Sequence, residues 1–154
     1  MSGKLPKISV ITPTLNQGKF IEKTINSVIG QDYPDLEYIV MDGGSTDNTL
    51  EILRRYGGRL KFTSSKDKGQ SDAINKGLKK SSGDILCYLN SDDVLAPGAL
   101  FKVGEYFNEN RNAMWLTGKC RVVDEEGREV FSTVVRIVVA QICLRGKDSN
   151  IRRK

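Results

Sequence analysis

The chain alternates short apolar runs with segments whose apolar residues recur at helical spacing. The β-branched run at residues 8–12 predicts a strand that stops at Pro13, because a proline cannot continue a hydrogen-bond ladder. Residues 21–29 carry apolar side chains every three or four positions, which predicts an amphipathic helix. The next apolar run, at residues 36–41, predicts a second strand.

The same alternation continues to about residue 131. After a tight turn it predicts, in order, a helix capped by Ser45 or Thr46, a weaker strand at 60–63, a helix that opens at Gly69, a strand at 85–89, a helix at 97–107, a strand at 113–119 and a hairpin at 121–131. The run at 85–89 is nearly all apolar and is expected to be buried on both faces. In the helix after Gly69, Ala73 and Gly77 form a stripe of small residues, which permits close packing against a sheet or a ligand.

Strands that alternate with helices are typical of βαβ units, so the expected fold class is α/β with a mainly parallel sheet. In such sheets ligands bind beyond the carboxyl ends of the strands. Polar residues gather at these ends: Pro13, Thr14 and Asn16 after the first strand, Asp42 after the second, and Asn90, Ser91, Asp92 and Asp93 after the fourth, with Asp72 at the start of a nearby helix. Separate capping roles in solvated loops would explain each residue alone but not their collection at one edge.

Asp92 and Asp93 are adjacent carboxylates at the end of a strand that is expected to be buried. They repel each other and are costly to hold out of water, and a hard divalent cation would offset that cost. Mg²⁺ typically binds one or two carboxylates together with substrate phosphates. The alternative is that both acids lead into the next helix, whose first turn favours negative charge.

Composition narrows the chemistry. At 154 residues, with 38% hydrophobic and 28% charged residues, the chain has the size and composition of one globular domain. Neither a signal peptide nor a membrane helix is expected, because no apolar run approaches the ~20 residues that a span needs. Three cysteines without a CxxC pair favour a reducing, cytoplasmic setting. The absence of histidine excludes His-based triads and His-ligated zinc, which leaves carboxylates for acid–base and metal chemistry.

The net charge of +5 comes from residues 132–154, since residues 1–131 are neutral. The sequence therefore divides into a neutral domain, residues 1–131, and a basic tail without an assigned structure, residues 132–154. No basic stripe interleaved with aromatic residues accompanies the tail, so nucleic-acid binding is not expected. A peripheral contact with anionic lipid on the cytoplasmic face of a membrane stays open beside the simpler expectation of a solvated terminus. The apolar segment 134–144 is compatible with a strand, an exposed sheet edge or a contact within an oligomer.

Two common phosphate-binding motifs are absent. The turn at 42–45 does not match GxGxxG and no GxxxxGK[ST] loop occurs, so neither dinucleotide redox chemistry nor ATP hydrolysis is expected. An acid after the second strand can accept hydrogen bonds from a base or a ribose, and the acids after the fourth can hold a metal on a diphosphate. Together these residues predict a site for a nucleoside diphosphate that carries a transferable group.

Four stretches in a characteristic order add a family likeness: SVITPTLN at 9–16, MDGGSTDNT at 41–49, DKGQSDAINKG at 67–77 and SGDILCYLNSDD at 82–93. With them, residues 8 to about 118 resemble the family 2 glycosyltransferases, inverting enzymes with the GT-A fold. The resemblance implies a Rossmann-like, three-layer α/β/α domain across residues 1–131 that binds a nucleotide sugar. It also implies transfer of a sugar from a nucleoside diphosphate donor, commonly a UDP-sugar, to a saccharide or lipid-linked acceptor, in polysaccharide or cell-envelope assembly.

The resemblance further implies roles for positions on the nucleotide side. Pro13, Thr14 and Asn16 would line the nucleotide pocket. Asp42 would contact the base, and Asp72 would lie against the nucleoside or the sugar.

The segment Asn90-Ser91-Asp92 stands where the family has its DxD motif. Asp92 would therefore coordinate Mg²⁺ or Mn²⁺ on the diphosphate, where the metal acts as a Lewis acid on the leaving group. Asp93 would help to hold the metal or orient the loop. Asn90 brings no negative charge to a position where the family usually has an aspartate, so a weaker affinity for metal is expected.

The catalytic base is not identified. Inverting transfer needs a carboxylate that deprotonates the acceptor hydroxyl, and family members supply it from an acceptor-binding half beyond this point. The later carboxylates are Asp124, Glu125, Glu126, Glu129 and Asp148, of which the first four fall in or near a predicted surface turn. A non-catalytic nucleotide-sugar-binding module is therefore the main alternative to an active transferase. A nucleotidyltransferase would fit the acids but not the stretch at 41–49.

Overall fold

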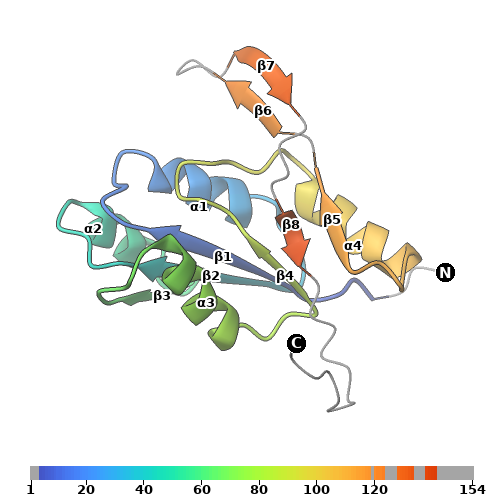
Figure 1. Ribbon diagram of the computed structural model, residues 1–154, viewed down its shortest axis with the longest axis horizontal. Helices are drawn as coiled ribbons and strands as arrows, with labels where there is room; N and C mark the ends of the chain where they lie inside the picture. Colours follow the sequence, from blue (N-terminus) through green and yellow to red (C-terminus); the bar gives the residue numbers. More distant parts are fainter. Residues whose placement is uncertain (1–3, 119, 124–127, 134–137, 142–154) are drawn as a thin grey trace.

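The computed structural model describes residues 4–118, 120–123, 128–133 and 138–141 of the chain. Within these residues a six-stranded sheet has the order β3-β2-β1-β4-β8-β5, and β6 and β7 form a separate hairpin that stands away from it (Figure 1). The strands are β1 (Ile8–Thr14), β2 (Leu36–Asp42), β3 (Lys61–Ser64), β4 (Ile85–Tyr88), β5 (Trp115–Thr117), β6 (Cys120–Val123), β7 (Glu129–Thr133) and β8 (Val138–Gln141). The helices are α1 (Ile21–Ile29), α2 (Thr49–Arg55), α3 (Gln70–Lys80) and α4 (Ala99–Glu109).

The sheet is mainly parallel and has helices on both faces. β3, β2, β1 and β4 are parallel neighbours, whereas β8 is antiparallel to both β4 and β5. On one face, side chains of α1, α2 and α4, including Ile25, Leu53 and Leu100, pack with Val10 and Val40 of the sheet. The other face carries α3 (Figure 1). The predicted α/β fold with three layers is confirmed.

Helix α3 packs tightly on its face because it presents small residues to the sheet. Ala73 is buried against Ile11 and Met41. A Cβ at Gly77 would come within 2.5 Å of Cγ2 of Ile11 and 3.2 Å of Cγ of Met41. The predicted stripe of small residues therefore lies against the sheet and fixes the height of α3 above it.

Strand β1 runs through Pro13, so the prediction that it stops there was wrong. The carbonyl of Thr14 accepts a hydrogen bond from Gly43 N–H (2.9 Å), while that of Ile11 accepts one from Leu89 N–H (2.9 Å). Backbone groups of alternate residues in a strand bond to opposite neighbouring strands. The backbone of Pro13 therefore points to the β4 side, as that of Ile11 does, but at a position beyond the end of β4. Because the β1–β4 pairing ends at Ile11 and Tyr88, the missing N–H of Pro13 interrupts no assigned pair, and β1 continues through its pairing with β2.

Strand β4 is fully buried on only one face, contrary to the prediction for residues 85–89. Ile85 and Cys87 are buried, but Leu86 and Tyr88 are half-buried. The reason is that α3 packs mainly over β1 and β2. Leu86 and Tyr88 instead line a hollow of about 260 Å³ beside α3.

The starts of two helices differ from the prediction. Helix α2 begins with Asn48 at its N-cap, so neither Ser45 nor Thr46 caps it. Helix α4 begins at Ala99 rather than at 97, because Gly98 adopts a left-handed conformation (φ 73°) that interrupts the helix.

The carboxyl-terminal part of the sheet is shorter than predicted. The strand expected at 113–119 is β5, which is three residues long, and the predicted hairpin is β6–β7. Part of the unplaced segment 134–144 forms β8, and its remainder, 134–137 and 142–144, lies outside the described residues. The division into a 1–131 domain and a 132–154 tail stays a prediction. No described helix has the length and apolar character needed to cross a membrane.

A buried carboxylate links neighbouring strands at the amino edge of the sheet. Glu37 of β2 accepts hydrogen bonds from Ser9 Oγ (2.7 Å) and Ser82 N–H (2.7 Å). Lys61 Nζ lies 3.0 Å from it. Burial raises the pKa of the Glu37 carboxyl, but these hydrogen bonds outweigh burial and lower it to about 2. Three parallel strands and the segment before β4 are thus tied together by one ionised group.

Candidate functional site

The carboxyl ends of β1, β2 and β4 meet at one edge of the sheet, because the three strands are parallel neighbours (Figure 1). Thr14 and Asp42 are direct register partners at the ends of β1 and β2. The loops that follow β1 and β2, residues 15–20 and 43–48, are called the paired loops.

Asp42 is only 2% exposed, and its carboxylate organises the second paired loop. It accepts hydrogen bonds from Gly44 N–H (3.1 Å), from Ser45 N–H (3.1 Å) and from the Ser45 hydroxyl. Ser64 Oγ, at the end of β3, donates a further bond (2.6 Å). Asp42 therefore contributes to the site by fixing the shape of the loop that follows it.

The paired loops are bonded to each other as well. Asn16, whose φ of 52° is left-handed, donates its N–H to Ser45 Oγ (2.7 Å). Its side-chain oxygen accepts from Thr46 N–H (2.8 Å). Two residues further on, Gly18 N–H donates to Asp47 (2.9 Å). These bonds hold the two loops as one unit at the end of β1 and β2.

Thr14 has a buried hydroxyl without a partner. The residue is 5% exposed, and its Oγ1 makes no hydrogen bond with the part of the chain that the structure describes. Pro13 beside it is buried too. Since buried polar atoms are almost always hydrogen-bonded, an unpaired one at a strand end is suited to pairing with a ligand.

The turn after β4, residues 90–93, is named the β4 turn. The carbonyl of Ser91 accepts a hydrogen bond from Thr24 Oγ1 of α1 (2.8 Å), which fixes the backbone of the turn. Asn90 Nδ2 donates to Asp93 Oδ2 (3.0 Å). Asp92 is exposed and Asp93 is half-buried. The pKa of the Asp93 carboxyl is raised. Burial is the main cause, the neighbouring charge of Asp92 adds to it, and the hydrogen bond from Asn90 offsets it in part.

The donor set of the β4 turn suits a cation that takes its other ligands from a substrate. Among the described residues no group of three or more His, Cys, Asp or Glu side chains could hold a metal by itself. Asp92 and Asp93 offer two carboxylates, and burial disfavours the charge on the second. That combination fits Mg²⁺ or Mn²⁺ bound jointly with a diphosphate.

Helix α3 adds two polar residues to this edge. Asp72 pairs with Lys76 (2.8 Å) and accepts from Lys68 N–H (3.0 Å), and the Lys76 bond lowers the pKa of its carboxyl. Gln70 Nε2 donates to Asn90 Oδ1 (2.6 Å), which joins α3 to the β4 turn. The sequence analysis assigned no role to Gln70, since a glutamine that opens a surface helix carries no local signal of its partner.

The predicted residues thus fall into two groups. Pro13, Thr14, Asn16 and Asp42 belong to the ends of β1 and β2, whereas Asp72 and residues 90–93 belong to α3 and the β4 turn. No hydrogen bond between described residues joins the groups directly. β1 holds both at one edge, since it pairs with β2 on one side and β4 on the other.

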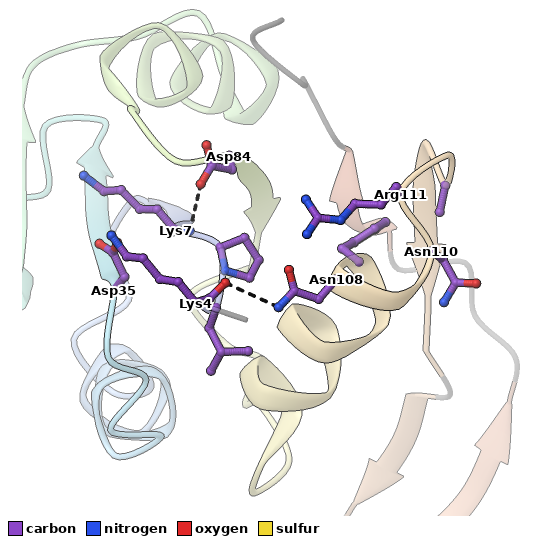
Figure 2. A pocket seen from close by; sticks show the side chains of 11 residues that line it. Lys4, Lys7, Asp35, Asp84, Asn108, Asn110 and Arg111 are labelled. Carbon is purple, nitrogen blue, oxygen red and sulfur yellow. Dashed lines mark hydrogen bonds and ion pairs between the residues drawn. The ribbon is translucent and has the colours of Figure 1, made fainter. Parts of the chain in front are cut away.

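A cavity of about 350 Å³ lies at the opposite, amino edge of the sheet (Figure 2). There Lys7 N–H donates to Asp84 Oδ2 (3.0 Å), and Asn108 Nδ2 donates to the carbonyl of Lys4 (3.4 Å). These contacts anchor the amino-terminal segment to β4 and α4. Neither this cavity nor the hollow beside α3 is lined by Asp42 or Asp92.

The described residues supply one of the carboxylates considered as a catalytic base. Glu129 of β7 is exposed and lies 3.7 Å from Arg121 in an ion pair across the hairpin. The other four, at 124–126 and 148, lie outside the described residues. The base therefore stays unidentified.

Comparison with known proteins agrees with this architecture. The family model described as Glycosyl transferase family 2 matches residues 9–136. The chain is 35% identical over 128 residues to the GalNAc(5)-diNAcBac-PP-undecaprenol β-1,3-glucosyltransferase of Campylobacter jejuni, covering 80% of this chain and 40% of that protein. It is 36% identical over 132 residues to the poly(ribitol-phosphate) β-N-acetylglucosaminyltransferase TarP of Staphylococcus aureus, covering 82% and 40%.

Solved structures with the same architecture contain nucleotide ligands. S. aureus TarS 1–349 in complex with UDP-GlcNAc superposes with a TM-score of 0.65 at 27% identity, covering 76% of this chain and 40% of that one. The mannosyltransferase PcManGT of Pyrobaculum calidifontis, in complex with GDP-Man and Mn²⁺, has a TM-score of 0.65 at 26% identity, covering 79% and 36%. The chain thus spans about two fifths of the length of these relatives. By its family match and its fold, the chain belongs to glycosyl transferase family 2.

Proposed function

We propose that the chain binds a nucleoside diphosphate sugar, by preference a UDP-sugar, at the carboxyl edge of its sheet. It would be the donor-binding part of a transferase that passes the sugar to a saccharide or lipid-linked acceptor. The observation that carries this proposal is the gathering of the paired loops, the unpaired Thr14 hydroxyl and the β4 turn at one edge. Supporting likenesses are a UDP-GlcNAc complex of TarS and a relative whose name includes a PP-undecaprenol saccharide.

The paired loops would form the nucleoside side of the site. Pro13 and Thr14 supply a buried wall, and the Thr14 hydroxyl is available to pair with a polar group of the nucleoside. Asn16 and Asp42 keep the loops in place through their hydrogen bonds, so that little order has to be gained on binding. Asp72 would lie beside the nucleoside or the sugar.

The β4 turn would form the diphosphate side. Asp92, which is exposed, is the residue best placed to hold Mg²⁺ or Mn²⁺, with Asp93 beside it and the backbone of Asn90 and Ser91 shaping the turn. A bound divalent cation would supply Lewis-acid stabilisation of the leaving nucleoside diphosphate. The Mn²⁺ in the PcManGT complex supports this choice of metal.

The proposal is tested by calorimetric titration of the chain with UDP, GDP and UDP-sugars, with and without Mn²⁺. We expect UDP to bind more tightly when Mn²⁺ is present and GDP to bind more weakly than UDP. Titration with Asp92→Ala should show UDP affinity that no longer responds to Mn²⁺, whereas Asp35→Ala, at the opposite edge, should behave as the wild type. Equal responses of both variants to Mn²⁺ would contradict the proposal.

A donor-binding module without transfer activity is the second candidate. It is favoured by one observation: among the described residues, the one carboxylate considered as a base, Glu129, is exposed and paired with Arg121 across the hairpin. Release of free sugar or UDP from a UDP-sugar by the chain, lost in Asp92→Ala, would favour the transferase. Tight UDP binding without any donor turnover would favour the module.

A further inference from the structure

Three side chains form a hydrogen-bonded relay from the start of α3 into the β4 turn. Gln70 Nε2 donates to Asn90 Oδ1 at 2.6 Å, and Asn90 Nδ2 donates to Asp93 Oδ2 at 3.0 Å. The N–H of Asp93 closes the turn by donating to the carbonyl of Asn90 at 3.2 Å. These residues come from two segments that are twenty positions apart in the sequence.

The direction of each bond follows from the chemistry of the groups. An ionised carboxylate can only accept, so the NH₂ group of Asn90 must face Asp93. The oxygen of Asn90 then faces Gln70, which must present its own NH₂ group. An aspartate at position 90 or a glutamate at position 70 would replace a donor by an acceptor and put two acceptors in contact.

The relay holds the side chains of the β4 turn, whereas other contacts hold its backbone. The backbone of the turn is fixed from the other side of the sheet by Thr24, which bonds to the carbonyl of Ser91. Within the described residues, the side chains of Asn90 and Asp93 have no hydrogen-bond partners other than each other and Gln70.

We propose that Gln70 is a positioning residue for the metal-binding turn: through Asn90 it fixes the Asp93 side chain, so that the turn presents Asp92 and Asp93 to the cation in one arrangement. This inference rests on the proposed function, because it assigns a purpose to the geometry of that site. It also accounts for an amide at position 90, since an amide can accept from Gln70 and donate to Asp93 at the same time, which an ionised aspartate cannot.

Substitutions that add opposite charges at position 70 distinguish the effect of the hydrogen-bonded relay from that of charge alone. Gln70→Glu removes the donor and adds a negative charge, whereas Gln70→Lys keeps a donor and adds a positive charge. Electrostatic attraction alone would strengthen Mn²⁺ binding in the first variant and weaken it in the second. The relay has the opposite consequence: Gln70→Glu should lose about tenfold in Mn²⁺ affinity, as is typical when a residue that supports a metal ligand is lost, and Gln70→Lys should retain it.

The measurement is the concentration of free Mn²⁺ by electron paramagnetic resonance during titration of the chain with UDP present. Asn75→Asp is the matched control, because it adds the same charge as Gln70→Glu at an exposed position five residues further along α3. Thermal unfolding midpoints of all variants should stay within a few degrees of the wild type, since position 70 is exposed.

Two results would overturn the inference in different ways. If Gln70→Glu binds Mn²⁺ as tightly as Asn75→Asp while the wild type binds normally, the relay has no positioning role and the proposed function stands. If the wild type binds no Mn²⁺ with UDP, the proposed function fails and this inference with it.

Discussion

At the scale of the residue, individual polar atoms decide what each part of the sheet can do. The NH₂ group of Asn90 makes a contact with Asp93 that an aspartate at 90 would replace by repulsion between two carboxylates. At the opposite edge, the Glu37 carboxylate is buried but satisfied by Ser9, Ser82 and Lys61. The first residue shapes a candidate site, whereas the second stabilises the fold.

The lowered pKa of Glu37 predicts how the stability of the fold depends on pH. Its pKa is lowered from 4.5 to about 2 in the folded chain, so its contribution is present above pH 4.5 and is lost as the pH falls towards 2. A shift of that size corresponds to about 3 kcal/mol. Urea denaturation at a series of pH values should show the wild type losing stability over this window.

The variant Glu37→Gln should be less stable than the wild type at pH 7 and should lose less on acidification. Glu51→Gln, which removes an exposed carboxylate on α2, serves as the control and should follow the wild type. A Glu37→Gln chain with wild-type stability at pH 7 would show that the buried carboxylate is not a net stabiliser.

Some residue roles could be predicted from the sequence and others could not. The position of Asp42 at the end of a buried strand was enough to place it at the candidate site. Its hydrogen bonds to Ser45 and Ser64 depend on the folding of the next loop and on a neighbouring strand, which no local pattern encodes. The partnership of Gln70 with Asn90 was missed for the same reason.

At the scale of the element, loops and one helix set the geometry of the candidate site. The paired loops are joined through Ser45, whose hydroxyl donates to Asp42 and accepts from Asn16 N–H. Helix α3 is seated on the sheet through Gly77 and carries Gln70 and Asp72 at its first turn.

Removal of the Ser45 hydroxyl should loosen the paired loops. Ser45→Ala leaves the Asn16 N–H without its acceptor and takes one donor from Asp42, so we expect a loss of about 1–3 kcal/mol in the free energy of unfolding and weaker UDP binding. Thr46→Ala is the control, because that hydroxyl is exposed and lies 3.4 Å from Asn16 Oδ1. Urea denaturation that gives the same midpoint for both variants would speak against the loop contact.

Gly77→Ala tests the seating of α3. In an open helix this change stabilises by up to about 1 kcal/mol, because alanine has the higher helix propensity. Here the new methyl group would meet Ile11 and Met41, so we expect a loss of about 1–3 kcal/mol instead. Asn75→Ala on the exposed side of the same helix should not destabilise the chain, and thermal unfolding distinguishes the two outcomes.

Most elements were predictable because the apolar periodicity differs clearly between strands and helices. The errors occurred where a neighbour overrides a local rule. Pro13 was expected to end β1, but it lies where β4 has already ended. Ser45 or Thr46 was expected to cap α2, but the Ser45 hydroxyl donates to Asp42 and the helix begins after Asn48. Leu86 was expected to be buried, but it is half-buried because α3 packs mainly over β1 and β2.

At the scale of the whole molecule, the sheet separates two chemically different edges. Its carboxyl edge carries the paired loops and the β4 turn (Figure 1). Its amino edge carries Glu37 with its partners and the anchored amino-terminal segment, which Figure 2 shows. The match to family 2 glycosyltransferases covers most of this chain and about two fifths of its relatives' length, and the function proposed for the described residues is donor binding.

The central claim is that residues from separate strands meet around one cation-bridged diphosphate, and paramagnetic relaxation tests it most directly. Backbone amide signals would be recorded by NMR with UDP and either Mn²⁺ or diamagnetic Mg²⁺. We expect Mn²⁺ to broaden the signals of Thr14, Ser45 and Ser91 while those of Lys7 and Asn108 persist. Broadening of Ser91 alone, or of the Lys7 edge, would contradict a shared site at the carboxyl edge.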